Sequence, residues 1–198
     1  MTSAYSYVLS ETMGISVDFS KTLGQTITES RSPRVPEGLD EGKFDAVIEK
    51  VEKAITDIHR PISHSGTATS AIIGVSSGGR IVHPLGPTLS SETFDYLNTE
   101  IRGDRRHSYV GKVSSYNTNT YKGRVYVEDE GRPVPMTLAE DVQSRRYVRK
   151  VVDSLAANAM DRFDAGAEIE FEAYESHSKS GRLKRYYVVD IDLGTKPR

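Results

Sequence analysis

Apolar and polar residues alternate most clearly in the last third of the chain, between residues 107 and 193. Ile169 and Phe171 alternate with glutamates at 168, 170 and 172, which is the pattern of a strand with one buried face. Shorter strand patterns lie at 109–116, 124–128 and 134–138. A last strand at 183–193 is expected to carry Tyr187, Val189, Ile191 and Leu193 on one side. Between the third and fourth strands, helical spacing predicts one helix with the apolar stripe Val148, Val151, Val152, Leu155, Ala159 and Phe163.

This order of elements predicts a five-stranded OB-like β-barrel with one helix, and an SH3-like barrel is the alternative. Barrels of the OB type bind ligands on one strand face and in two loops. The sequence therefore indicates where a ligand would bind more clearly than what the ligand is, because a fold does not fix a function.

The N-terminal part of the chain predicts an α+β region. An apolar stripe between Phe44 and Ile58, with charged residues on the other side, predicts a helix over 43–59 that ends before Pro61. Two strand patterns predict a hairpin near 68–83, because Gly78 and Gly79 allow the positive φ of a tight turn.

A second, shorter helix is expected after Ser90 or Ser91, either of which can cap it. Its apolar face would contain Phe94, Leu97 and Ile101, and Gly103 would end it. The polar run 104–107 then separates an α+β region, 1–105, from the barrel, 107–193. Further short strands are possible at Tyr5–Leu9 and Ile15–Phe19, followed by a loop at 30–36.

Composition excludes several classes of protein. Of the 198 residues, 36% are hydrophobic and none is cysteine, so a core is possible but disulfides and zinc-thiolate sites are not. The net charge of −2 argues against a wholly basic nucleic-acid coat. Residues 1–10 lack the features of a signal peptide, and no apolar run approaches the ~20 residues of a membrane span. We expect a cytoplasmic protein with no membrane partner.

The two loops at the ligand face of the predicted barrel contain aromatic, amide and basic residues. One, 117–122, joins the first two strands, and the other, 176–182, joins the last two. Tyrosines can stack on bases, which contributes about 1–3 kcal/mol per base, and basic side chains can neutralise phosphates. We therefore predict single-stranded DNA or RNA as the ligand. The predicted binding residues are Tyr116, Asn117, Asn119, Tyr121, Lys122, Arg124, Tyr126, Lys179, Arg182, Lys184 and Arg185.

Ordinary structural roles are the alternative for these residues, because tyrosines favour strands and asparagine, serine and glycine favour turns. The glutamates at 168, 170 and 172 also weigh against phosphate binding if they lie beside Lys184 and its neighbours and pair with them. Strand register decides this question. A second basic run, Arg145–Lys150, can likewise contact phosphates or form i,i+4 pairs on a solvated helix, Arg145 with Asp141 and Arg149 with Asp153.

One sequence motif resembles a catalytic one. Gly74–Gly78 matches G-x-S-x-G, the nucleophile elbow of serine hydrolases, which requires a strand, a sharp turn and then a helix. A second strand and then His83-Pro84 follow instead, so a hydrolase that uses Ser76 is a remote alternative. The histidines are scattered, and His59 and His64 are expected to be polar loop residues. No metal site, cofactor or catalytic set is predicted.

The segment Gly111–Val127, together with residues 132–136 and 178–184, resembles uncharacterised bacterial proteins with a small C-terminal β-barrel. The resemblance extends over about 66–193 and implies no activity, cofactor or catalytic residue. We thus interpret the chain as a non-enzymatic binding module. The rival interpretation is a protein-interaction or assembly subunit of a bacterial complex, or a homo-oligomer, marked by an exposed apolar patch on helix 43–59 or an unpaired sheet edge.

Overall fold

The computed structural model describes residues 41–84, 87–161 and 163–194. The possible strands at Tyr5–Leu9 and Ile15–Phe19 and the loop at 30–36 lie outside this range. The chain forms two compact units. The first contains Met1–Thr99 and the short segment Ser178–Arg182, and the second contains Glu100–His177 and Leu183–Arg198.

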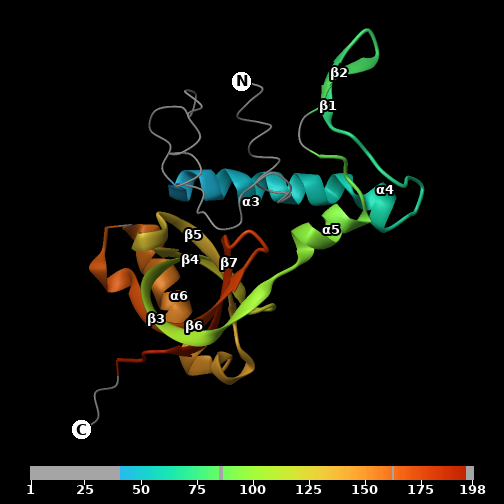
Figure 1. Cartoon of the computed structure of the whole chain (residues 1–198). Coiled ribbons are helices and arrows are strands. Elements are labelled where there is room, and N and C mark those ends of the chain that lie inside the picture. The colour runs from blue at the N-terminus through green and yellow to red at the C-terminus, as the bar shows by residue number, and fades with distance from the viewer. Residues whose placement is uncertain (1–40, 85–86, 162, 195–198) are drawn as a thin grey trace. The chain divides into compact units, whose positions relative to one another are not determined.

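The second unit is a closed five-stranded barrel (Figure 1). Its strands follow the order β3-β4-β5-β7-β6, with β5 and β7 parallel and the other pairs antiparallel. One helix lies between the third and fourth strands, which confirms the predicted α+β fold with an OB-like barrel. The elements are β3 (Ile101–Asn117), β4 (Lys122–Val127), β5 (Arg132–Leu138), α6 (Arg145–Met160), β6 (Glu168–His177) and β7 (Leu183–Ile191).

The barrel core consists of the inward residues of all five strands. In β6, Ile169, Phe171 and Ala173 are at most 2% exposed, as the alternation predicted. The prediction that Tyr187, Val189 and Ile191 of β7 share one side was wrong, because Ile191 is buried with Tyr186 and Val188, whereas Tyr187 and Val189 are half-buried. The pairing of β6 with β7 contains two register shifts, and such bulges break the strict period of two on which the prediction relied.

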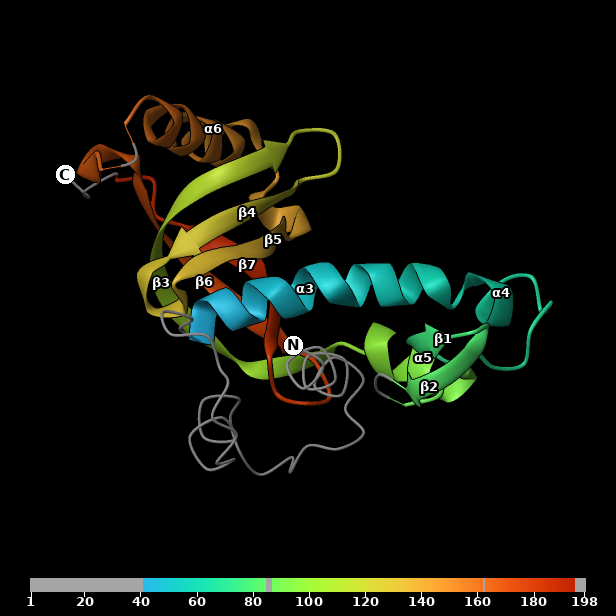
Figure 2. The same cartoon turned by 90° about the horizontal axis from the view of Figure 1, so that it is seen from above.

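The helix α6 packs along the outside of β3 (Figure 2). Val151 is fully buried there, but Val152 is 38% exposed, and Phe163 lies beyond the end of the helix with 78% exposed. The predicted apolar stripe was therefore too wide and too long. The buried contact includes a polar residue, Ser154, whose hydroxyl accepts from Val113 N at 3.1 Å and donates to Ala167 O.

The polar run 104–107, expected to separate two parts of the chain, lies within β3. The preceding helix, α5 (Ser91–Asn98), ends earlier than predicted, so Ile101 belongs to the strand and Gly103 does not end the helix. Ser90 caps α5 as expected, in a capping box with Thr93.

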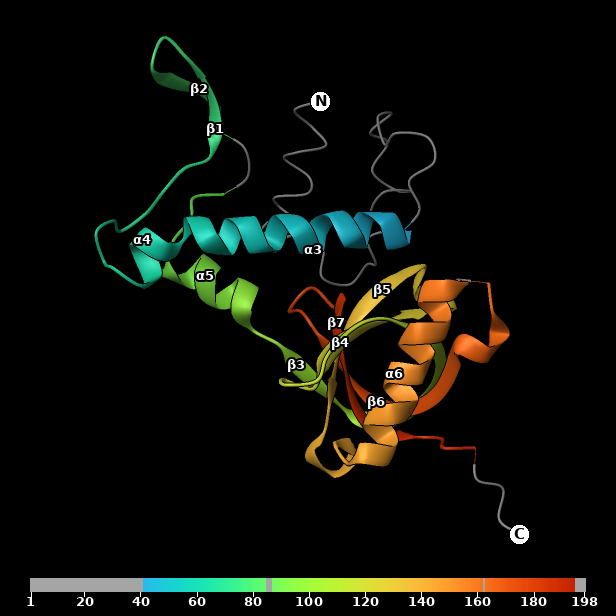
Figure 3. The same ribbon diagram turned by 180° about the vertical axis from the view of Figure 1, so that it is seen from behind.

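The first unit contains the predicted long helix, α3 (Glu41–Ile58), and a short turn of helix, α4 (Arg60–Ser63). The predicted hairpin is present as β1 (Gly74–Ser77) and β2 (Arg80–Pro84), and Gly78 and Gly79 have the expected positive φ. The hairpin projects away from the helices (Figure 3). Ile55, Leu89 and Leu97 form the core between α3 and α5.

His59, expected in a polar loop, is instead fully buried. Its Nδ1 lies 2.7 Å from Ile55 O and its Nε2 lies 2.8 Å from Thr93 Oγ1. The imidazole satisfies both of its nitrogens where α3, α4 and α5 meet, which is a structural role. Within the part of the chain that is described, no helix has the length and apolarity to span a membrane.

Candidate binding face of the barrel

Strand register places polar and aromatic residues in a row across four adjacent strands. Lys122 of β4 is opposite Thr137 of β5, Thr137 is opposite Tyr187 of β7, and Tyr187 is opposite Tyr174 of β6. The neighbours of these residues along each strand, such as Val125, Met136, Tyr186 and Ala173, are buried. Because side chains alternate between the two faces of a strand, the row lies on the outside of the barrel.

The two tyrosines of this row share a cation. The guanidinium carbon of Arg102, an exposed residue of β3, lies 4.0 Å from the ring centroid of Tyr187 and 4.6 Å from that of Tyr174. Both distances are well within the range of an attractive cation–π contact. Side chains from β3, β6 and β7 thus form one cation–π cluster on the outside of the barrel.

Further basic and aromatic residues adjoin the row. Arg124 donates to Pro133 O at 2.7 Å, and Tyr126, which points the same way from β4, is 40% exposed. Arg185 donates to Thr137 Oγ1 at 3.0 Å and lies 3.6 Å from the carboxylate of Glu100. We call this surface the basic–aromatic face, and it consists of Arg102, Lys122, Arg124, Tyr126, Tyr174, Arg185 and Tyr187.

The first predicted loop, 117–122, has mostly structural contacts. Asn117 Oδ1 accepts from the backbone of Asn119 at 2.9 Å and of Thr120 at 3.3 Å, which shapes the turn. Tyr121 has a positive φ of 54° and packs against the barrel core, as Tyr116 does. Burial, and then the proximity of Tyr121, raise the pKa of Tyr116 above its usual value. Asn117, Asn119 and Lys122 are the exposed residues of the predicted set here.

The second predicted loop belongs to the first unit. Arg182 forms an ion pair with Glu52 of α3, and the two side chains are only 10% and 13% exposed. Lys179 lies 5.4 Å from the ring centroid of Tyr96. Lys184, which follows in β7, is half-buried and already has a partner. The two predicted loops thus belong to different units, and Arg182 already pairs with Glu52 within its own unit.

The register also decides where the glutamate row of β6 lies. Glu172 is opposite Asp190 in β7, far from Lys184, and pairs with Arg106 of β3. Glu168 lies 3.7 Å from Lys112, also of β3. Glu168 and Glu172 therefore lie beside basic residues of β3 rather than beside Lys184 or Arg185.

Residues 105–192 match a family of unknown function, DUF7947. The match begins within β3 and ends just after β7, so it concerns the barrel. No curated protein and no solved structure matches the chain.

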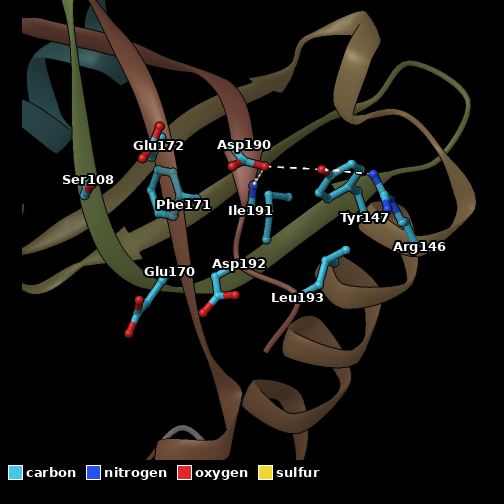
Figure 4. A pocket seen from close by; sticks show the side chains of 10 residues that line it. All are labelled: Ser108, Arg146, Tyr147, Glu170, Phe171, Glu172, Asp190, Ile191, Asp192 and Leu193. Atoms are coloured by element: carbon cyan, nitrogen blue, oxygen red, sulfur yellow. Dashed lines mark hydrogen bonds between the residues drawn. The ribbon is translucent and has the colours of Figure 1, made fainter. Parts of the chain in front are cut away.

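A surface pocket of about 470 Å³ lies at the other end of β6 and β7 from the tyrosine pair (Figure 4). Four carboxylates line it, those of Glu170, Glu172, Asp190 and Asp192. Tyr147 donates to Asp190 at 3.3 Å and accepts from Arg146 at 3.4 Å. Nowhere in residues 41–84, 87–161 and 163–194 are three acidic or histidine side chains grouped to hold a metal ion. The charged lining of the pocket is therefore mainly acidic, with Arg146 as a basic residue beside the four carboxylates.

The basic run at the start of α6 is partly explained by local pairing. Arg149 lies 3.6 Å from Asp153, the predicted i,i+4 pair, and Arg146 stacks on its neighbour Tyr147 at 4.8 Å. Arg146 and Tyr147 line the acidic pocket, and the pair of Arg149 with Asp153 lies on the exposed surface of the helix.

Sequence reasoning missed a polar cluster beside the barrel core. Tyr109 donates to Glu175 at 2.6 Å, and the other oxygen of Glu175 lies 3.3 Å from His177. Burial, the bond to Glu175 and nearby negative charge raise the pKa of Tyr109 far above its usual 10.0. Burial likewise raises the pKa of Tyr186, whose ring packs 4.6 Å from that of Tyr109. The cluster thus connects the buried Tyr186, through Tyr109, to the partly exposed Glu175 and His177.

The nucleophile-elbow motif does not have the required geometry. Ser76 lies within β1, and the turn at Gly78 and Gly79 leads into the antiparallel strand β2. A nucleophile elbow requires a helix after the turn.

Sequence reasoning missed Arg102, Tyr174 and Tyr187 as members of the candidate face. Alternation in β6 offered a signal for Tyr174, since it continues the outward series of glutamates. Arg102 offered none, because its segment was expected to end a helix.

Proposed function

We propose that the protein is a binding module for single-stranded nucleic acid that uses the basic–aromatic face of its barrel. Stacking of bases on aromatic groups and neutralisation of phosphates by lysine and arginine are the two contributions that such binding needs. The residues of the basic–aromatic face provide both contributions on the outside of the barrel.

The observation that supports the proposal most strongly is the row Lys122–Thr137–Tyr187–Tyr174. Adjacent strands lie about 4.8 Å apart, so the row follows the outside of the closed barrel over a path of about 14 Å. A strand of a few nucleotides can follow such a row, with phosphates near Lys122 and Arg185 and bases at the tyrosine end.

The proposal assigns the two loops a smaller contribution to binding than the sequence prediction did. Arg182 already pairs with Glu52, and Tyr116 and Tyr121 pack on the core. We therefore expect Tyr121→Ala and Arg182→Ala to weaken binding less than changes on the strand face.

The test is fluorescence anisotropy with labelled single-stranded DNA and RNA of about 12 nucleotides. Binding is measured at about 50 and about 200 mM salt, because phosphate contacts make affinity fall steeply with salt. We expect Lys122→Ala to reduce the salt slope by about one, and Tyr187→Leu to weaken binding about tenfold.

Matched controls are available away from the face. Arg149→Ala removes an exposed arginine that pairs with Asp153, and Tyr147→Leu removes a half-buried tyrosine beside the acidic pocket. Both should bind as the unaltered protein does. Absence of binding at low salt, or equal losses in the control and face variants, would reject the proposal.

A second candidate function, self-association, is favoured by an apolar stripe on α3. Val47 and Ile58 are 41% and 45% exposed, and the eleven positions between them equal three helical turns, which places both on one side. Val51 and Ala54 lie between them on that side. Light scattering tests this candidate: a dimer mass that is lost in Val47→Glu and Ile58→Glu would support it, and a monomer mass of the unaltered chain would exclude it.

A further inference from the structure

The guanidinium of Arg102 lies over the rings of Tyr174 and Tyr187. Arg102 is exposed and yet lies 4.0 Å and 4.6 Å from the two ring centroids, so its planar group covers Tyr187 and Tyr174. A ligand that approaches this part of the barrel therefore meets Arg102 before it meets either ring.

The backbone of β3 explains how Arg102 reaches this position. Arg102 is opposite Ser176 of β6, whereas Arg106 is opposite Tyr174, so β3 advances four residues while β6 advances two. Such a bulge redirects side chains at the edge of a regular ladder. Ser176 is in turn opposite Arg185 of β7, so two arginines flank one buried serine on the same surface.

Two carboxylates of this part of the barrel pair with arginines other than Arg102. The carboxylate of Glu100 lies 3.6 Å from Arg185, and that of Glu172 pairs with Arg106. Arg102 is held by ring contacts instead, which orient its plane without neutralising its charge.

Resting on the proposed function above, we infer that Arg102 is the base-stacking residue of this face and that a nucleobase stacks on its outer plane. Guanidinium planes are established stacking surfaces for unpaired bases, and the rings beneath keep the plane fixed before the ligand arrives. Tyr174 and Tyr187 then act as positioning residues, and Lys122 and Arg185 contact phosphates.

In this arrangement the base and the phosphates contact different residues, so their contributions can be tested separately. Arg102→Lys retains the charge but removes the plane, so it should affect only strands that carry a base at this position. Tyr187→Leu removes the support and should act in the same way, whereas Tyr187→Phe keeps a ring beneath Arg102 and should bind normally.

The experiment compares two labelled DNA strands of equal length, one with bases and one composed of abasic sites, in anisotropy titrations of the full chain. Arg102→Lys should weaken binding of the base-bearing strand about tenfold, which is typical of one lost stacking contact. Its binding of the abasic strand should stay within about twofold of the unaltered protein, with an unchanged salt slope.

Several results would overturn the inference and leave the proposed function standing. These are an unaltered affinity of Arg102→Lys for both strands, an equal loss for both strands, or a loss in Tyr187→Phe as large as that in Tyr187→Leu. If the unaltered protein binds neither strand at low salt, the proposed function fails and the inference with it. Thermal unfolding of each variant shows whether it is folded. Arg102 is exposed, so the fold should tolerate Arg102→Lys.

Discussion

Ser154 is a polar residue that is buried between α6 and the barrel because it forms hydrogen bonds there. Ser154 occupies a position on α6 where an amphipathic pattern calls for an apolar side chain, and it is 3% exposed. Its hydroxyl satisfies Val113 N and Ala167 O, and Asn158 one turn later donates to Val113 O at 3.0 Å. These bonds attach the helix where the pairing of β3 with β4 shifts register.

The first prediction concerns this attachment. Ser154→Ala leaves a buried N–H and a buried C=O without their partner, so we expect the free energy of unfolding to fall by about 2 kcal/mol. Urea unfolding measures the change, with Ser144→Ala, at the exposed start of α6, as the control. A loss no larger than that of the control would show that the hydroxyl contributes nothing.

The second prediction concerns Tyr186, which is fully buried. No described residue forms a hydrogen bond with its hydroxyl. Burial of a hydroxyl without a partner costs about 1–3 kcal/mol, so Tyr186→Phe should leave stability unchanged or raise it by about 1 kcal/mol. Tyr109→Phe, which removes a hydroxyl bonded to Glu175, should lower it. The same loss in both variants would contradict the assignment.

At the scale of elements, the segment between β6 and β7 is joined to α3 by the ion pair of Arg182 with Glu52. The segment is shaped by its own bonds, including Arg182 N to Ser178 Oγ at 3.1 Å, and by the positive φ of Gly181. A residue predicted to bind phosphate thus has a carboxylate partner within its unit.

The third prediction follows from the low exposure of this pair. Removal of one partner leaves the other charge poorly solvated, so Glu52→Gln should destabilise the fold by about 2 kcal/mol. Arg182→Met should cost a similar amount, and the double variant should cost less than the sum of the two. Additive losses in a double-mutant cycle would show that the two groups do not interact. Asp57→Asn, at an exposed position of the same helix, is the matched control.

For the whole molecule, the buried phenols couple stability to pH. The pKa values of Tyr109, Tyr116 and Tyr186 are raised in the fold, whereas in the unfolded chain these groups titrate near 10.0. The folded state therefore keeps protons that the unfolded state releases. The resulting stability is fully present below pH 10 and is lost as the pH rises beyond it.

The fourth prediction is a fall in the free energy of unfolding above about pH 10, by up to about 1.4 kcal/mol per pH unit for each such tyrosine. Denaturant titrations at a series of alkaline pH values measure it. Tyr109→Phe should make the fall shallower, whereas Tyr126→Phe, on the exposed surface, should leave it unchanged. A slope that is the same in all three proteins would exclude these buried phenols as the cause.

The local elements of this protein were predictable because their signals are local. Glu168–Phe171 alternates in β6 as in its sequence, the stripe of α3 has helical spacing, and the glycine pair forms the hairpin turn. The order of the elements along the chain was sufficient to predict the barrel. Errors arose where bulges or a single serine changed the period, in β7 and α6.

The candidate face was only partly predictable. Lys122, Arg124, Tyr126 and Arg185 were named from their loops and strands, because residue type and neighbouring sequence suggested them. Arg102, Tyr174 and Tyr187 were not, since the contact between them depends on the register of three strands separated by up to 85 positions.

The sequence by itself determined the order and type of the barrel elements and the absence of cysteine chemistry, because periodicity and composition are properties of the chain. Only the tertiary structure decided which charges are neutralised. It paired Arg182 with Glu52, placed Glu168 and Glu172 beside basic residues of β3, and placed Arg102 over two tyrosines. The physical reason is that pairing depends on distances of a few ångströms, and these are set by strand register and bulges that no local pattern encodes.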